Sequence, residues 1–152
     1  MHIVQITHAK GATCAAILAT LPAWFGIAEA NAAYVRDVEA MPMFGASADG
    51  AVIGFLALNR HTPHAFEIHV MGVIPAQHRR GAGRALVDAA AAHARSAGAR
   101  FLTVKTLSPR APDPGYAATR AFYEGLGFLA LEEFPMLWSA DNPALMLIKL
   151  LD

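Results

Sequence analysis

The chain has 152 residues, a length that fits one domain with its own hydrophobic core. Hydrophobic residues make up 55% of the chain and charged residues 16%, a balance that excludes an intrinsically disordered protein. Lys plus Arg and Asp plus Glu number twelve each, so no global field gathers nucleic acid or an anionic membrane. We expect one domain over residues 1–152, with neither nucleic acid nor a membrane as partner.

The single cysteine and the N-terminus predict a soluble, cytoplasmic protein. Cys14 cannot form a disulfide within the chain, and such usage is common in a reducing compartment. Residues 1–8 lack a basic segment followed by an apolar core, and no apolar run reaches the ~18 residues of a membrane span. No base or cation near Cys14 in sequence would lower its pKa, which favours a buried structural thiol over a nucleophile.

Alternation and composition predict a strand, two helices and a hairpin in the first sixty residues. The predicted elements are a strand over 2–7, helices over 11–21 and 28–38, and strands over 43–47 and 51–59. Asp49-Gly50 is a signal for a tight hairpin turn between the last two strands. Residues 60–64 are predicted to form a solvated loop rather than a metal site, because no third ligand is placed beside His61 and His64.

The stretch from residue 66 to residue 98 predicts a strand, a tight basic turn and a helix. Apolar and other side chains alternate over 66–71, and Pro75 ends the strand because proline has no N–H for a ladder. Residues 85–97 are nearly all strong helix formers, and Gly98 can cap that helix.

The turn itself is suited to a phosphate or a pyrophosphate. Gly81 and Gly83 leave the main chain open, the first amides of the helix have no intrahelical acceptor, and three arginines add positive charge. These arginines are Arg79, Arg80 and Arg84. A dinucleotide-binding loop would need glycine where Leu86 stands, and a nucleoside-triphosphate loop would need Lys and then Ser or Thr after Gly83.

What remains resembles the pyrophosphate loop of the GNAT superfamily of acyl-CoA N-acyltransferases. That loop has the pattern Gln/Arg-x-x-Gly-x-Gly/Ala and follows a strand that ends in Val-x-Pro. This chain has Val73-Ile74-Pro75 and then His78-Arg79-Arg80-Gly81-Ala82-Gly83. His78 departs from the pattern at its first position, but a loop that binds mainly through backbone amides tolerates this change.

The remainder of the chain predicts a mixed α/β fold. The predicted elements are a strand over 101–106, a loop over 107–114, a helix over 116–125 and strands over 128–134 and 145–150. Trp138 and Asn142-Pro143 are assigned to the connection between the last two strands. The resemblance implies a mixed, mostly antiparallel sheet of six to seven strands with a splayed parallel pair, and about four helices on both faces.

The resemblance also implies acetyl-CoA as co-substrate and no metal. Residues 78–84 would bind its pyrophosphate, and the main chain at Met71, Gly72 and Val73 would face the cofactor. One amide there would polarise the thioester carbonyl, as an oxyanion donor does. Gly72 suits a bulge in that strand because glycine tolerates unusual dihedrals. Trp24, Phe25 and Tyr34 either line the acceptor cleft that paired N-terminal helices shape in this superfamily or belong to the core.

Two side chains are candidates for proton transfer. Glu67 lies four residues before Met71, a spacing similar to that of the strand glutamate that is the base in histone-acetylating members, and His69 is the substitute. The alternative for Glu67 is a solvated carboxylate or a partner of His69 or Arg79. Tyr123 occupies the position of a tyrosine that protonates the departing thiolate in this superfamily, in a helix-to-strand segment that ends Gly127-Phe128.

We expect an acetyl-CoA-dependent N-acetyltransferase that transfers acetyl directly to a primary amine of a small molecule or a peptide. The alternative is a non-catalytic acyl-CoA-binding sensor or assembly module. Four points stay open: the acceptor, the preferred acyl group, the oligomeric state, with a homodimer as one option, and the base, which is Glu67, His69 or a water chain. Tyr116 stands where many relatives have an asparagine that contacts the pantetheine.

Overall fold

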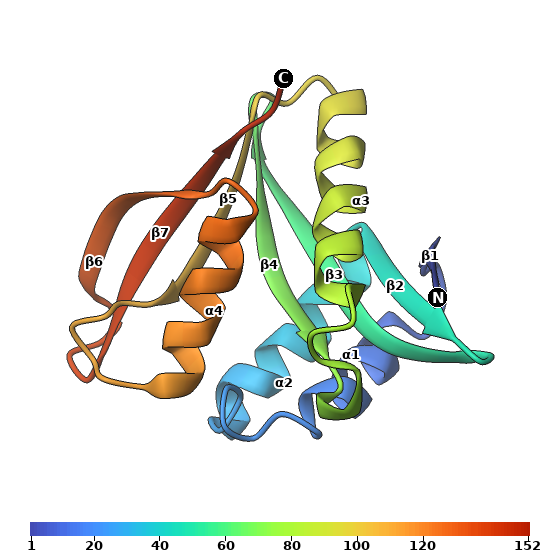
Figure 1. Cartoon of the computed structure of the whole chain (residues 1–152), viewed down its shortest axis with the longest axis horizontal. Coiled ribbons are helices and arrows are strands. Elements are labelled where there is room, and N and C mark those ends of the chain that lie inside the picture. Colours follow the sequence, from blue (N-terminus) through green and yellow to red (C-terminus); the bar gives the residue numbers. More distant parts are fainter. The chain divides into compact units, whose positions relative to one another are not determined.

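The computed structural model describes all 152 residues (Figure 1). The strands are β1 (His2–Gln5), β2 (Met43–Ala48), β3 (Ala51–Thr62), β4 (Ala65–Val73), β5 (Phe101–Leu107), β6 (Leu129–Ser139) and β7 (Asn142–Leu150). The α-helices are α1 (Lys10–Leu18), α2 (Ala28–Asp37), α3 (Ala82–Ser96) and α4 (Pro114–Gly125), and two short 3₁₀ helices are η1 (Val38–Ala40) and η2 (Pro75–Gln77). No helix is both long and apolar enough to cross a membrane.

The seven strands form one sheet in the order β1-β2-β3-β4-β5-β7-β6. The pairs β1–β2, β2–β3, β5–β7 and β6–β7 are antiparallel. β4 and β5 start together and run the same way, because the amides of Arg100 and Phe101 both donate to the His64 carbonyl, at 2.8 and 3.0 Å. The predicted mixed, mostly antiparallel sheet with four α-helices is confirmed.

The chain divides into two compact units, and each is described by itself. Unit 1 contains Met1–Asn59 and Ile68–His93, and unit 2 contains Arg60–Glu67 and Ala94–Asp152. Because β3 and β4 each pass from one unit into the other, the tip of their hairpin belongs to unit 2.

Helices cover both faces of the sheet in unit 1. Phe55 of β3 is fully buried in a cluster with Ile17 of α1, whereas a Cβ on the neighbouring Gly54 would lie 3.3 Å from the Leu86 side chain of α3. Consecutive residues of a strand point to opposite faces, so α1 and α3 lie on opposite faces of β3. The hairpin turn before β3 has the predicted form, with φ of 53° at Asp49 and 80° at Gly50.

The β3–β4 hairpin is longer than the sequence predicted. β3 continues to Thr62, so the predicted loop over 60–64 is wrong except at its last two residues. Arg60 explains the extension, because its guanidinium donates to the carbonyls of Pro63 and Ala97 and lies 5.2 Å from the centre of the Phe66 ring. The polar residues from Arg60 onward led the sequence analysis to end the strand at Asn59, whereas these contacts keep Arg60 within β3.

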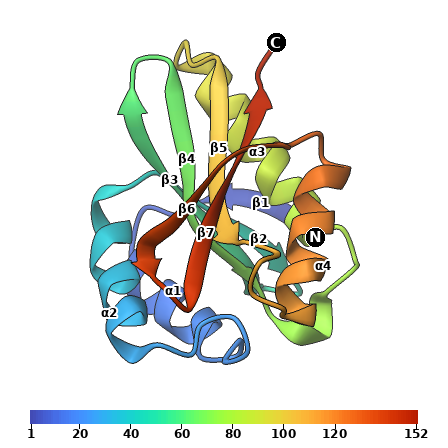
Figure 2. The same cartoon turned by 90° about the vertical axis from the view of Figure 1, so that its left-hand side faces the viewer.

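Unit 2 is built on β5, β7 and β6, which lie side by side (Figures 1 and 2). Helix α4 starts at Pro114, two residues earlier than predicted, because the Asp113 carboxylate caps it by accepting from the Tyr116 amide at 3.1 Å. The predicted connection at Trp138 and Asn142-Pro143 is also wrong. Both segments are strand, since β6 runs to Ser139 and Ser139 pairs with Asn142 of β7.

Candidate active site

The turn between β4 and α3 has the open main chain that the sequence predicted. Arg79 and Gly81 both have left-handed backbones, with φ of 61° and 91°, and a Cβ added at Gly81 would meet nothing within 4 Å. Helix α3 starts at Ala82, three residues before the predicted start, and its first hydrogen bond runs from the Ala85 amide to the Gly81 carbonyl. The amides of residues 82–84 therefore have no intrahelical acceptor.

His78 ties this turn back to the strand before it. Its Nε2 lies 2.6 Å from the Val73 carbonyl oxygen, so that nitrogen donates, and its ring packs edge-on against Trp24 at 5.9 Å. The His78 ring therefore connects the turn to the last residue of β4. The side chains of Arg79, Arg80 and Arg84 are exposed, which leaves their charge available to an anion.

The end of β4 is shaped by close packing rather than by an unusual φ. Gly72 does not have a positive φ, but a Cβ there would lie 2.8 Å from the Leu21 side chain. Glycine at this position is therefore required by space. Two consecutive residues before it, His69 and Val70, both reach the same helical layer, since Val70 packs in the α1 cluster and the His69 ring lies 5.5 Å from that of Tyr34.

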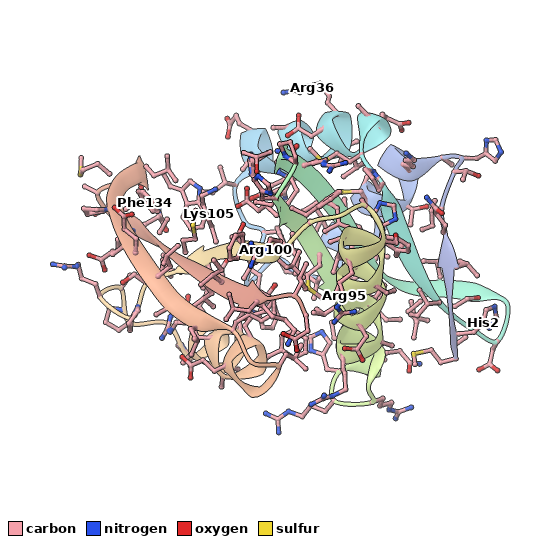
Figure 3. All side chains as sticks on the ribbon, turned by 90° about the horizontal axis from the view of Figure 1, so that it is seen from above. His2, Arg36, Arg95, Arg100, Lys105 and Phe134 are labelled. Atoms are coloured by element: carbon pink, nitrogen blue, oxygen red, sulfur yellow. The ribbon has the colours of Figure 1, made fainter.

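Glu67 is buried and fully paired, which excludes the alternative of a solvated carboxylate, and its role as the base stays a prediction. Its side chain is 7% exposed; Oε1 lies 2.6 Å from Nε2 of His61, and Oε2 accepts from Nζ of Lys105 at 2.7 Å. Lys105, labelled in Figure 3, comes from β5. The partners are therefore not His69 or Arg79, the two that the alternative interpretation of Glu67 named. The Lys105 ammonium and the hydrogen bond from His61 compensate a carboxylate that would otherwise be costly to bury.

His61 and Lys105 are site residues that sequence reasoning missed. His61 was assigned to a loop, and only the extension of β3 places it beside Glu67. Lys105 did leave a signal, because it interrupts the otherwise uncharged β5 sequence Phe-Leu-Thr-Val-Lys-Thr-Leu. A single cation in a largely buried strand indicates an acidic partner.

His69 forms a second histidine–carboxylate pair, in unit 1. Its Nε2 lies 2.9 Å from Oδ2 of Asp37 at the end of α2. The side chain of His69 is 22% exposed and that of Asp37 is 44% exposed. The Tyr34 ring packs edge-on between His69 and Phe25, and Tyr34 and Phe25 are partly buried against the α1 cluster.

Tyr123 lies in the core of unit 2. It is 4% exposed, and its ring packs edge-on against Phe122 at 5.2 Å and against Phe128 at 5.3 Å. Burial raises the pKa of its phenol, with a smaller contribution from Tyr116, so the hydroxyl keeps its proton at neutral pH. The helix-to-strand segment closes as its glycine predicted, with φ of 93° at Gly127.

Glu133 of β6 anchors the loop before α4, a contact that the sequence did not reveal. Its carboxylate accepts from the buried Ser108 hydroxyl and from the Arg110 guanidinium, whose Nε lies 3.0 Å away. These hydrogen bonds lower the pKa of Glu133. The Ser108 hydroxyl also accepts from the Arg110 amide, so both residues are held at the start of the loop.

Cys14 is a buried structural residue, and no metal-binding group is found. Cys14 is fully buried, and burial raises the pKa of its thiol to about 11, as expected for a structural residue. The structure contains no group of three or more His, Cys, Asp or Glu side chains arranged to hold a metal ion.

Comparison of the sequence with models of known protein families gives a match over most of the chain. A family model described as the acetyltransferase (GNAT) family matches residues 16–128, well over half of the chain. No curated protein matches the sequence.

Solved acetyltransferases share the fold. An aminoglycoside 6'-N-acetyltransferase complexed with coenzyme A has a TM-score of 0.80 and 17% identity, over 100% of this chain and 98% of its own. The aminoglycoside 6'-N-acetyltransferase from Enterococcus faecium has a TM-score of 0.78 and 18% identity, over 100% and 98%. A ribosomal-protein-alanine N-acetyltransferase from Brucella melitensis has a TM-score of 0.73 and 21% identity, over 99% and 100%. At such identities the likeness shows the fold alone.

Proposed function

Because the chain belongs to the acetyltransferase (GNAT) family, we propose that it is an acetyl-CoA-dependent N-acetyltransferase that transfers acetyl directly to a primary amine. The turn between β4 and α3 is the observation that supports this most directly. Left-handed Arg79 and Gly81 leave the start of α3 open to a ligand, and the sequence of the turn is the one that resembles the pyrophosphate loop.

The turn fits a diphosphate. The amides of residues 82–84 lack intrahelical acceptors, the positive end of the helix dipole lies there, and three exposed arginines surround it. Acetyl-CoA would supply an acetyl group already activated as a thioester. The proposed cofactor-binding residues are Met71, Gly72, Val73, His78, Arg79, Arg80, Gly81, Ala82, Gly83 and Arg84.

The proposed reaction needs one proton removed and one supplied. An alkylammonium with a pKa of ~10 must lose a proton before it can attack a thioester, and Glu67 occupies the position that the resemblance assigns to this task. The departing thiolate needs a proton in return. Tyr123 is the proposed donor, and the burial that raises its pKa keeps the phenol protonated until then.

One observation favours the alternative of a non-catalytic acyl-CoA-binding module. Both carboxylate oxygens of Glu67 are paired within the chain, and the side chain is only 7% exposed. A carboxylate that only stabilises the hairpin would look the same. Turnover separates the two functions, whereas binding of coenzyme A does not.

The test measures thiol release from acetyl-CoA with a panel of amines. Because some structural relatives are named for acetylating aminoglycosides and a ribosomal-protein alanine, the panel includes an aminoglycoside, a peptide with N-terminal alanine, polyamines and free amino acids. Turnover of any amine supports the proposal. Coenzyme A binding without turnover of any of them would favour the sensor, and no coenzyme A binding would contradict both functions.

Two variants test the cofactor site with a matched control. Arg80→Ala and Arg84→Ala should each weaken coenzyme A binding about tenfold in calorimetry, because each removes a charged donor to a phosphate. Arg36→Ala is the control, since Arg36 is an exposed arginine that points outward from α2 (Figure 3). Equal losses in all three variants would argue against a site at the turn.

A further inference from the structure

We propose that His61 is the group that takes the proton from the acceptor ammonium, and that Glu67 is the positioning residue that orients it, with Lys105 holding the far side of the carboxylate. This inference rests on the proposed N-acetyltransferase activity. It follows from three side chains on three strands: His61 on β3, Glu67 on β4 and Lys105 on β5.

Exposure separates the roles of the two partners. The Glu67 side chain is 7% exposed, and each of its oxygens has a strong partner, at 2.6 and 2.7 Å. The His61 side chain is 46% exposed. A base must come within hydrogen-bond distance of the proton that it removes, so the imidazole is the member of the pair that an incoming amine can reach.

The hydrogen bond to Glu67 also selects the tautomer of His61. An ionised carboxylate only accepts hydrogen bonds, so Nε2 bears the hydrogen and Nδ1 keeps its lone pair. A buried carboxylate that fixes the tautomer of a more exposed imidazole is the arrangement by which a histidine base is oriented and its protonated form stabilised. Lys105 keeps Oε2 occupied, so the carboxylate cannot turn away from the ring.

The proton balance is simple. Nδ1 of His61 takes one proton from the ammonium, and the ring becomes an imidazolium next to the Glu67 carboxylate. The free amine then forms the C–N bond as the C–S bond breaks, and the thiolate takes a proton from Tyr123. The acylated nitrogen loses its extra proton, which restores the tyrosine through solvent, and the imidazolium releases its proton to solvent.

The test measures thiol release from acetyl-CoA for four variants and for the wild type, with the amine that the wild type acetylates fastest. His61→Gln should lower kcat by about 10²- to 10⁴-fold, the usual contribution of a general base, with coenzyme A affinity unchanged. His61→Gly should lose a similar amount of activity, and added imidazole should raise its kcat at least tenfold, since the His61 side chain is partly exposed to solvent. Glu67→Gln should lose less than His61→Gln, because its amide oxygen still accepts from Nε2, and imidazole should not restore it.

His64→Gln is the matched control, because His64 is an exposed histidine in the same hairpin, and it should keep wild-type activity. Coenzyme A affinity and the unfolding midpoint show that each variant is folded. An active wild type with His61→Gln within threefold of it would overturn the inference and leave the N-acetyltransferase intact, with Glu67 itself or His69 as base. A wild type that binds coenzyme A but acetylates no amine would contradict the proposed function, and this inference with it.

Discussion

The two histidine–carboxylate pairs of this chain are built in opposite ways. In the pair of unit 2 the carboxylate of Glu67 is buried and the imidazole of His61 is exposed, whereas in unit 1 the carboxylate of Asp37 is more exposed than the imidazole of His69. Glu67 has a second partner, Lys105, whereas no second partner of Asp37 is seen. The same two chemical groups therefore differ in accessibility: the first pair exposes its imidazole to solvent, and the second exposes its carboxylate and holds the His69 ring near the end of α2.

The largest predicted loss of stability comes from removing the Glu67 carboxylate. Glu67→Ala leaves Lys105 and His61 without their shared carboxylate, and the free energy of unfolding should fall by about 3 kcal/mol, as when one partner of a buried ion pair is removed. Urea denaturation followed by circular dichroism measures this. A loss below about 1 kcal/mol would contradict the prediction that the buried contacts of Glu67 with Lys105 and His61 stabilise the folded protein.

Removing the cation instead of the carboxylate should cost less. Lys105→Met keeps the hydrogen bond to His61 and leaves one buried oxygen unpaired, which is expected to cost about 2 kcal/mol. The double variant Glu67→Ala/Lys105→Met should lose less than the sum of the losses in Glu67→Ala and Lys105→Met, because both single variants remove the same contact. Additive losses in urea denaturation would show that the two side chains are not coupled.

The pair in unit 1 should contribute little. Asp37→Ala removes an exposed carboxylate, so the expected loss of stability is about 0.5 kcal/mol or less, and raising the salt concentration should reduce it further. Thermal unfolding at two salt concentrations is the measurement. A loss as large as that of Glu67→Ala would remove the contrast between the pairs.

The smallest effect concerns a third carboxylate, Glu133, which lies more open than Glu67. Hydrogen bonds lower its pKa in the folded protein, so its contribution to stability is present above about pH 4.5 and is lost as the pH falls through the lower folded-state pKa. Glu133→Gln should therefore lower the melting temperature slightly near pH 7 and leave it unchanged in acid, where wild-type Glu133 is itself protonated, so that the fall of the melting temperature toward acid pH becomes flatter. An unchanged acid slope would contradict this assignment.

The sequence predicted the parts of the site that depend on local structure. The Val-x-Pro strand end, the open basic turn and the alanine-rich helix lie within thirty residues, and their dihedrals follow from glycine and proline at fixed positions. Tyr123 was assigned from the resemblance of its helix-to-strand segment, in which Gly127, two residues after the end of α4, has a positive φ. Their roles in binding and proton transfer remain predictions.

The partners of Glu67 could not be predicted in this way. Lys105 is 38 residues away in sequence, and His61 faces the carboxylate only because contacts of Arg60 with Ala97 and Phe66 keep β3 extended past its expected end. The spacing to His69 suggested a different partner, but the side chain of His69 turns to Asp37 instead.

By itself, the sequence determined the order of strands and helices along the chain and the tight turns, because hydrophobic periodicity and the backbone preferences of glycine and proline act over a few residues. The family followed from the resemblance of the motif over residues 73–83 and from the family model that matches residues 16–128. The tertiary structure decided which charges meet. Whether a carboxylate is buried between a histidine and a lysine or left in solvent depends on strands brought together from distant parts of the chain, and no local pattern records that pairing.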